Sequence, residues 1–250
     1  MGNLKEVEVI LRNKEVDVNG RDKKGLTPLM IAVNLGHLDI VKRLLEVPEI
    51  KLDIGAPDGD TALHYACSYN DNNNNNRVSI IKLLCQESRC SPSVVNKKNS
   101  RGDTPLMRAV VGGNLDFVRT LLEHPGIKLG HKNMYGNTAL HMACHNNRVS
   151  IIKLLCQDTR CGPSVVNKKN SRGHTALMLY TNGVYYRHLA VDVVKELDIE
   201  GTDFLTKYDD GRTLIEVASR ENRAEVLEYL LERPKVDSLK VIAAHNIADM

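Results

Sequence analysis

Aromatic residues are scarce in this chain of 250 residues, which contains no Trp, two Phe and eight Tyr, so that aromatic residues make up 4% of it. We therefore expect no aromatic platform on which nucleic-acid bases could stack. The formal net charge is only +3, which does not suggest a protein that binds nucleic acid through a basic tail. Nucleic acid is therefore not an expected partner.

Long apolar runs and catalytic motifs are also missing from the sequence. No stretch approaches the roughly 20 apolar residues that span a bilayer, and residues 1–6 lack the apolar run of a secretory signal. No P-loop, nucleophile elbow or Gly-x-Gly-x-x-Gly motif after a strand occurs. We expect a protein without catalytic activity, cofactor or membrane insertion, located inside the cell, in the cytoplasm or alternatively the nucleus.

Internal repetition is the most informative feature that is present. Residues 77–102 and 148–173 differ at only three of 26 positions, and the two copies are offset by 71 residues. A shorter signature, Gly-x-Thr-Pro/Ala-Leu, recurs within and around them. Its threonines lie 34 to 43 residues apart, at Thr27, Thr61, Thr104, Thr138, Thr175 and, in a weaker copy, Thr213. A period of this length predicts a repeat architecture.

Each part of the signature has a physical reason. Glycine permits the positive φ of a tight turn, threonine caps a helix, and proline is tolerated at the first helical position. The leucine, with a small residue three positions later, begins an apolar stripe. Further apolar residues at helical spacing predict a second helix, for example over 38–45, 115–122 and 224–231. Each unit therefore reads as a turn followed by two helices.

A turn and two helices at this period, opened by Gly-x-Thr-Pro-Leu, resemble the ankyrin repeat. The resemblance implies an all-α solenoid in which each repeat is a turn or β-hairpin tip followed by a helix-turn-helix. The family's usual histidine after the leucine is present at His64 and His141. Other residues stand there in the remaining copies, so those turns are expected to lose a polar contact; the residues are Met30, Met107, Met178 and Ile215.

The predicted organisation has three parts. Residues 1–20 form a partial N-terminal repeat or cap consisting of a second helix, and residues 238–250 form a C-terminal capping helix. Six repeats lie between them, over 21–54, 55–97, 98–131, 132–168, 169–206 and 207–237. Two helix-to-helix turns are lengthened. We expect the run of asparagines over 71–76 to be a loop that packs against no core.

The six cysteines occupy three duplicated pairs of positions, Cys67/Cys144, Cys85/Cys156 and Cys90/Cys161. Their spacing does not supply the two paired clusters of ligands of a zinc module, so no metal site is expected. In a reducing compartment the thiols would be free. Cys90 and Cys161, on predicted loops, are the expected reactive thiols.

The resemblance implies that partners bind a concave face formed by the turn tips and the first helices. The predicted tips are mostly basic, at Lys23, Lys24, Lys97, Lys98, Arg101, Lys132, Lys168, Lys169 and Arg172. Acidic residues, Asp58, Asp60 and the pair at 209–210, are expected to interrupt this stripe. The expected partner is another protein with an acidic or phosphorylated segment, bound by a monomer; the alternative is that these charges only maintain solubility.

The sequence offers two further candidate sites and two alternative functions. Tyr185 and Tyr186, in the second lengthened turn, resemble an interface anchor, although they could instead fold over neighbouring helices. The sequence from Leu11 to Asn19 resembles the pattern that asparaginyl hydroxylases accept in ankyrin repeats, which makes Asn19 a candidate modification site. The alternative functions are a small-ligand or nucleotide-binding ankyrin domain and the targeting arm of a larger enzyme or channel.

Overall fold

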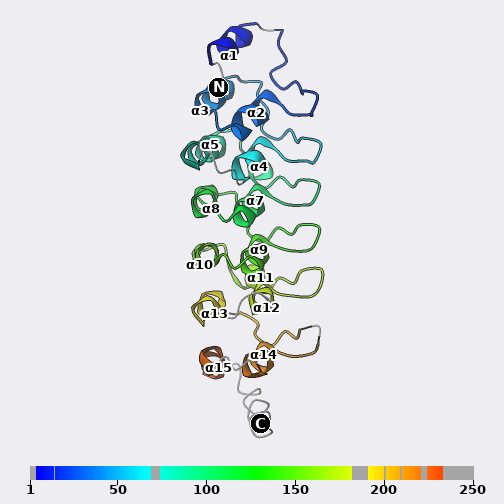
Figure 1. The fold of residues 1–250 in the computed structure, drawn as a ribbon, viewed down its shortest axis with the longest axis vertical. Helices are drawn as coiled ribbons and strands as arrows, with labels where there is room; N and C mark the ends of the chain where they lie inside the picture. Colours follow the sequence, from blue (N-terminus) through cyan, green and yellow to red (C-terminus); the bar gives the residue numbers. More distant parts are fainter. Residues whose placement is uncertain are drawn as a thin grey trace. The chain divides into compact units, whose positions relative to one another are not determined.

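The computed structural model describes residues 4–13, 15–68, 74–181, 191–199, 201–208, 210–220 and 224–232. Contacts divide the chain into two compact units, unit 1 (Met1–Met134) and unit 2 (Tyr135–Met250). Every regular element in the described ranges is a helix (Figure 1). The prediction of an all-α repeat fold is confirmed.

Unit 1 consists of helix pairs stacked on one another. Its helices in the described ranges are α1 (Leu4–Leu11), α2 (Pro28–Asn34), α3 (Leu38–Leu45), α4 (Ala62–Cys67), α5 (Asn74–Gln86), α6 (Pro92–Val95), α7 (Pro105–Gly112) and α8 (Leu115–Leu122). The first helices of the repeats pack in the order α2, α4, α7, and the second helices in the order α1, α3, α5, α8. In Figure 1 the turn tips of this unit project beyond the first helices, away from the second.

Unit 2 repeats the same arrangement. Its helices in the described ranges are α9 (Ala139–His145), α10 (Val149–Gln157), α11 (Pro163–Val166), α12 (Ala176–Thr181), α13 (Val191–Leu197), α14 (Leu214–Arg220) and α15 (Ala224–Leu231). First helices α9 and α12 pack together, and second helices α10, α13 and α15 pack in succession. The four-residue helices α6 and α11 lie in the two enlarged connections of the duplicated segment.

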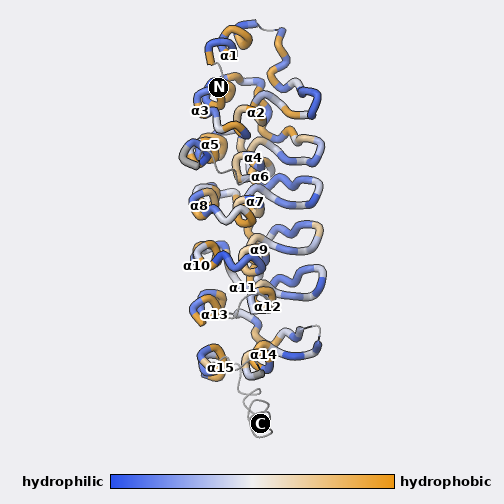
Figure 2. Tube along the Cα trace, viewed as in Figure 1, coloured by the Kyte–Doolittle hydropathy of each residue, from blue (hydrophilic) through white to orange (hydrophobic). Residues whose placement is uncertain are grey.

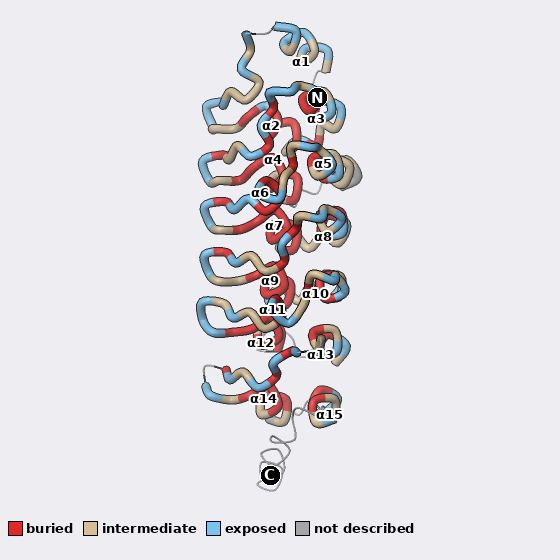
Figure 3. Tube along the Cα trace, turned by 180° about the vertical axis from the view of Figure 1, so that it is seen from behind, coloured by how far each residue is buried: buried red, intermediate tan, exposed pale blue. Residues whose placement is uncertain are grey.

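The signature residues form the helices for the expected reasons. Thr27 caps α2, because its Oγ1 accepts the backbone N–H of Met30 at 3.3 Å, and Pro28 is the first helical residue. Leu29 and Ala32 are then buried, with 1% and 4% of their surfaces exposed. Within each unit, Figure 2 shows hydrophilic tips, and Figure 3 shows buried residues concentrated on the first helices and on the facing sides of the second helices. The apolar stripe of each repeat is therefore covered by its neighbours in the stack.

Two expectations about these elements need correction. The asparagine run is not all loop, because residues 74–76 lie in α5 and Asn76 Nδ2 donates to the Gly36 carbonyl at 3.2 Å. In the sixth repeat the position of the family's histidine is held by Glu216, whose Oε2 accepts the Thr213 N–H at 2.5 Å. Ile215 instead occupies the leucine position, where 1% of its surface is exposed.

The methionines also keep part of the contact that they were expected to lose. Met30 Sδ accepts the Thr27 N–H at 3.4 Å, a weak hydrogen bond that the other methionine copies repeat. Residues 71–73, the turn that holds Tyr185 and Tyr186, and the expected capping helix at 238–250 lie outside the described residues. The boundaries proposed for the repeats stay predictions.

Candidate interaction surface on the turn tips

The turn tips are small hairpins closed by backbone hydrogen bonds. In the third tip, Asn99 N–H donates to the Asp103 carbonyl at 3.0 Å, and Gly102 N–H donates to the Asn99 carbonyl at 2.9 Å. Gly102 has a φ of 75°, and a Cβ there would lie 3.0 Å from the backbone of Asn133 in the next tip. Both the left-handed conformation and the close approach therefore require glycine.

Neighbouring tips within a unit are linked to one another. In unit 1, Ser100 N–H donates to the Asp58 carbonyl and Met134 N–H donates to the Arg101 carbonyl, each at 2.9 Å. In unit 2, Ser171 N–H donates to the Tyr135 carbonyl at 3.0 Å. Each linked pair holds its two tips in register, so charged side chains on consecutive tips keep a fixed spacing.

Most of the predicted basic residues are exposed on these tips. Lys168 is half-buried, and the exposed residues are Lys23, Lys24, Lys97, Lys98, Arg101, Lys132, Lys169 and Arg172. In unit 1 the structure brings the third and fourth tips together through Lys98, whose Nζ donates to the Lys132 carbonyl at 2.7 Å. We define the basic tip cluster as Lys97, Lys98, Arg101 and Lys132.

Asp60 does not interrupt the basic stripe, because only 1% of its surface is exposed. Its carboxylate accepts hydrogen bonds from Asn99 Nδ2 at 2.7 Å and from Arg108 Nη2 at 3.0 Å. A carboxylate is buried at acceptable cost only when it is paired in this way. The expectation was wrong for Asp60, although Asp58 of the same tip is exposed.

His64, the histidine of the family signature in this repeat, lies near the Asp60 carboxylate and is also buried. His64 Nδ1 accepts the Thr61 N–H at 3.1 Å, which leaves the proton on Nε2 to donate to the Asp103 carbonyl at 3.0 Å. Burial is the largest cause that lowers the pKa of His64 below its ordinary value. His141 makes the corresponding bonds in unit 2, at 3.3 Å to Thr138 and 3.0 Å to His174. Each of these histidines therefore links the first helix of its own repeat to the tip of the next repeat.

Sequence reasoning missed the amides and the arginine that organise the tips. Asn99 Oδ1 accepts the N–H groups of Arg101 and Asp103, at 3.0 and 2.9 Å, and Asn133 Nδ2 donates to Asp103 Oδ1 at 2.9 Å. A signal was available, because an Asp or Asn stands three residues before the tip glycine in four of the copies. These residues are Asp22, Asn99, Asn133 and Asn170. No comparable pattern in the sequence indicated that Arg108 pairs with the buried carboxylate of Asp60.

Asn19 is half-buried and links two segments of unit 1. Its Nδ2 donates to the Glu49 carbonyl at 2.8 Å, and its Oδ1 accepts the Lys51 N–H at 2.9 Å. Asn96 and Asn167 make the same pair of bonds in later repeats. The amide of Asn19 is therefore one of a repeated set of structural links.

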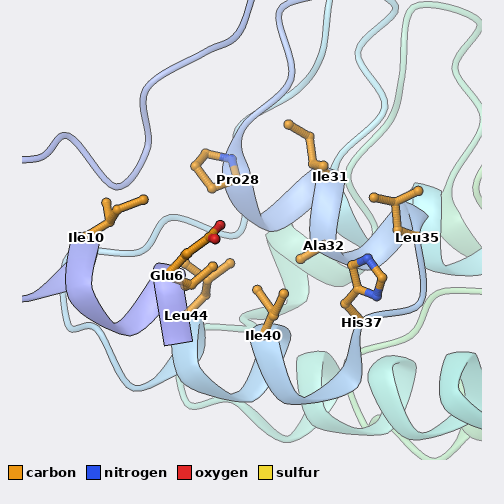
Figure 4. A pocket seen from close by; sticks show the side chains of 10 residues that line it. Glu6, Ile10, Pro28, Ile31, Ala32, Leu35, His37, Ile40 and Leu44 are labelled. Atoms are coloured by element: carbon orange, nitrogen blue, oxygen red, sulfur yellow. The ribbon is translucent and has the colours of Figure 1, made fainter. Parts of the chain in front are cut away.

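An apolar groove of about 440 Å³ lies between α1, α2 and α3 (Figure 4). Its lining residues are Glu6, Val7, Ile10, Pro28, Ile31, Ala32, Leu35, His37, Ile40 and Leu44. Leu35 has 57% of its surface exposed. Among the described residues that line the groove, His37 is the one ring-bearing basic residue and none is Lys, Arg, Phe or Tyr, so the lining does little to favour a nucleotide.

The expected loop cysteines are less accessible than predicted. Cys90 and Cys161 do lie outside α5 and α10, but each has only 5% of its surface exposed. Cys67 and Cys144 lie in first helices and are fully enclosed, and burial raises the pKa of both thiols.

Within the described ranges, no three His, Cys, Asp or Glu side chains gather as a metal cluster. None of the described helices has the length and apolar character needed to cross a membrane.

Comparisons with known proteins agree with this geometry. The family model described as ankyrin repeats (3 copies) matches residues 1–90, 52–133, 72–165 and 128–197. A solved structure, the ankyrin repeat protein EF0377, matches with a TM-score of 0.67 and 27% identity, covering 82% of this chain and 96% of that one.

Two curated relatives show how varied the similar proteins are. The chain is 25% identical over 232 residues to the phosphocholine transferase AnkX of Legionella pneumophila, covering 87% of this chain and 23% of the relative. It is 29% identical over 174 residues to the mouse B-cell lymphoma 3 protein homolog, covering 70% of this chain and 36% of the relative. The chain spans less than half of the length of the curated relatives it matches.

Proposed function

The chain belongs to the ankyrin repeat family, and from this premise we propose that its basic tip cluster binds an acidic or phosphorylated segment of a partner protein. Ankyrin repeats generally mediate protein–protein interaction and are generally non-catalytic. The observation that carries the proposal is the pair of linked tips in unit 1, which expose basic side chains while the nearby Asp60 carboxylate is buried and paired.

The chemistry of the basic tip cluster suits an anionic segment. Lys98 uses one of its three ammonium donors on the Lys132 carbonyl, so two donors remain for a ligand. Arg101 is exposed, with Nε 3.8 Å from Asp103 Oδ2, and its planar guanidinium matches a carboxylate or phosphate. Exposed charges of this kind contribute mainly to association rate and register.

Phosphorylated or acidic peptides provide the direct test. We would measure binding by fluorescence anisotropy with labelled peptides that share one sequence and carry serine, glutamate or phosphoserine at the same positions. The salt concentrations would be about 0.05 and 0.5 M, where the Debye length is about 14 and 4 Å. We expect the phosphoserine peptide to bind best and its affinity to fall as the salt rises.

Reversing the charge of tip lysines tests whether the partner binds the basic tip cluster. The double variant K97E/K98E should weaken binding by about tenfold or more, since each exposed ionic contact contributes about 0.2–1 kcal/mol and reversal makes it repulsive. The matched control is K42E/K82E, because both lysines are exposed on second helices and the net charge changes equally. Equal losses in the two variants, or binding that ignores salt, would leave the tip lysines as solubilising charge only.

Unit 2 carries a second set of basic tip residues, Lys168, Lys169 and Arg172. We propose the same role for this set within its own unit, and K168E/K169E tests it separately with the same peptides.

Tyr185 and Tyr186 remain a proposed interface anchor, which the double variant Y185A/Y186A tests. That variant should weaken partner binding without changing its dependence on salt.

Asn19 stays a proposed hydroxylation site, supported by the match of the sequence from Leu11 to Asn19 to the pattern of the hydroxylases. The test is incubation with an asparaginyl hydroxylase followed by peptide mass spectrometry. One added oxygen on the peptide that holds Asn19, absent from the N19A variant, is expected. No mass change would dismiss the site.

The remaining expectations are part of the same proposal: a monomer inside the cell, without a cofactor. The alternative that the chain is the targeting arm of a larger enzyme has one observation in its favour. The chain covers 23% of AnkX, which is a phosphocholine transferase.

A further inference from the structure

The fourth tip carries two exposed apolar side chains. Met134 and Tyr135 stand directly before the tip glycine, and 62% and 59% of their surfaces are exposed. The other tips have no pair of large apolar residues at these two positions. The residues there are Lys23 and Lys24, Pro57 and Asp58, Ser100 and Arg101, Ser171 and Arg172, and the acidic pair at 209–210. The hairpin therefore does not require apolar side chains at these positions.

Met134 is fixed beside the basic tip cluster of unit 1. Its N–H donates to the Arg101 carbonyl at 2.9 Å, and a Cβ at Gly102 would lie 3.0 Å from the Met134 nitrogen. Lys98 Nζ also reaches this tip, where it donates to the Lys132 carbonyl at 2.7 Å. An exposed apolar side chain and several cations therefore project from two tips whose backbones are in contact.

The two kinds of side chain would contribute differently to binding. Exposed ionic contacts are screened by salt and mainly set association rate and register. Removal of apolar surface from water is the stronger source of affinity, and the flexible, polarizable side chain of methionine adapts to the shape of a partner. A single exposed apolar residue is ordinary on a protein surface, but Met134 has a fixed place next to cations that attract an anionic segment.

Unit 2 contains a similar pairing. The Tyr135 carbonyl accepts the Ser171 N–H at 3.0 Å, and the exposed Arg172 follows Ser171 in the chain. Tyrosine is enriched among the residues that dominate binding at interfaces. Each unit thus holds a large exposed apolar side chain on a tip whose backbone is bonded to a basic tip.

We propose that Met134 is a specificity-determining contact for the partner of the basic tip cluster, and that the anionic segment of this partner carries a large apolar residue close to its acidic or phosphorylated residue. An extended segment rises about 3.3 Å per residue, so a separation of about one to three positions lets it reach both Arg101 and Met134. Tyr135 has the same role beside Arg172 in unit 2. This inference rests on the proposed function, because it adds a second feature to the same partner segment.

Paired peptides test the inference in the full chain that carries K168E/K169E, where the basic set of unit 2 is reversed. Labelled peptides contain phosphoserine or serine, and leucine or alanine at one position within about three residues of it. Fluorescence anisotropy should show that the best leucine phosphopeptide binds about five- to tenfold more tightly than its alanine counterpart, because leucine buries more apolar surface. Equal affinities of these two would overturn this inference alone. No preference for phosphoserine over serine would overturn the proposed function as well.

Substitution of Met134 locates the apolar contact. M134S introduces the residue found at Ser100 and Ser171, so the tip can keep its conformation. It should abolish the preference for leucine and keep the preference for phosphoserine. The matched control is L35S, which removes a side chain that is 57% exposed at the C-cap of α2 and should keep both preferences. An unchanged leucine preference in M134S would overturn the proposal, and so would loss of both preferences, because Met134 would then act on the structure of the tip.

Methyl-labelled methionine provides a direct readout of the contact. The chain has seven methionines, and comparison with M134S assigns the Met134 methyl resonance. The leucine phosphopeptide should shift this resonance and leave those of the buried Met30 and Met107 unchanged. No shift of the Met134 resonance at saturating peptide would contradict the proposal. In the K97E/K98E chain, Y135A should abolish the leucine preference of unit 2, and its persistence would exclude Tyr135.

Discussion

Asn99 Nδ2 donates to the buried carboxylate of Asp60 at 2.7 Å, whereas Asn170, its duplicate in unit 2, donates to the amide oxygen of Asn137 at 2.9 Å. The seven residues 96–102 and 167–173 are identical in sequence. The same amide therefore faces a charged acceptor in one unit and a neutral one in the other. The difference comes from the preceding tip, 39 or 33 residues earlier.

This relationship predicts that the two asparagines tolerate an added negative charge unequally. N99D places a second carboxylate against Asp60 and should lower the free energy of unfolding by about 2–4 kcal/mol at pH 7. N170D faces Asn137, whose amide can rotate to present its NH₂, and should cost about 1 kcal/mol or less. Urea denaturation of both variants checks this. Equal losses would contradict the assigned pairing of Asn99 with Asp60.

Arg77 predicts a second contrast between the duplicated segments. Its side chain is 2% exposed, and it donates to the carbonyls of Asn34 at 2.7 Å, Tyr65 at 2.8 Å and Ser68 at 3.3 Å. R77A leaves these carbonyls without their cationic donor and should cost about 2–4 kcal/mol. Arg148, its exposed duplicate, is the matched control, and R148A should change stability by about 0.5 kcal/mol or less. Thermal or urea unfolding of each variant measures the difference. Similar losses of stability in R77A and R148A would disprove the stabilising role of the hydrogen bonds from Arg77 to these carbonyls.

Substitution of two tip glycines distinguishes the cost of a left-handed backbone from the cost of placing a Cβ against the neighbouring tip. Gly136 and Gly173 have φ values of 72° and 81°, but an added Cβ would lie 2.5 Å from Ser171 N at the first and touch nothing within 4 Å at the second. G173A should therefore cost about 1–2 kcal/mol from the left-handed backbone alone. G136A should cost clearly more, because it also forces apart the hydrogen bond from Ser171 to Tyr135. Equal costs in equilibrium unfolding would argue against the close approach of these tips.

His64 predicts part of the dependence of stability on pH. Because its folded pKa is lowered by burial, the unfolded chain binds the proton more readily, and stability falls as the pH drops below about 6.5. H64M removes the titrating group and introduces the residue found at positions 30, 107 and 178. Between pH 7.5 and 5.5 this variant should lose less stability than the wild type. H145M, at an exposed position, is the control and should follow the wild type; the same pH dependence in H64M would refute the assignment.

Much of the helical framework was predictable, since its determinants are local. The N-cap at Thr27, the proline after it and the positive φ of the tip glycines involve residues within a few positions of one another. The exposure of most basic tip residues followed from the same pattern. The missed elements were those that depend on distant partners: the burial of Asp60 by Arg108, and the amides that link neighbouring tips.

The same ten residues occur at 77–86 and at 148–157. They show which structural features nearby residues determine and which depend on distant ones. By itself this segment specifies an amphipathic helix in both copies, through apolar residues at helical spacing and straight-chain helix formers. Only the tertiary structure places its arginine, buried within α5 at Arg77 and exposed at the N-terminus of α10 at Arg148. Backbone preference depends on neighbours a few residues away. Solvation and charge pairing depend on which distant carbonyls, such as that of Asn34, are brought within hydrogen-bonding distance.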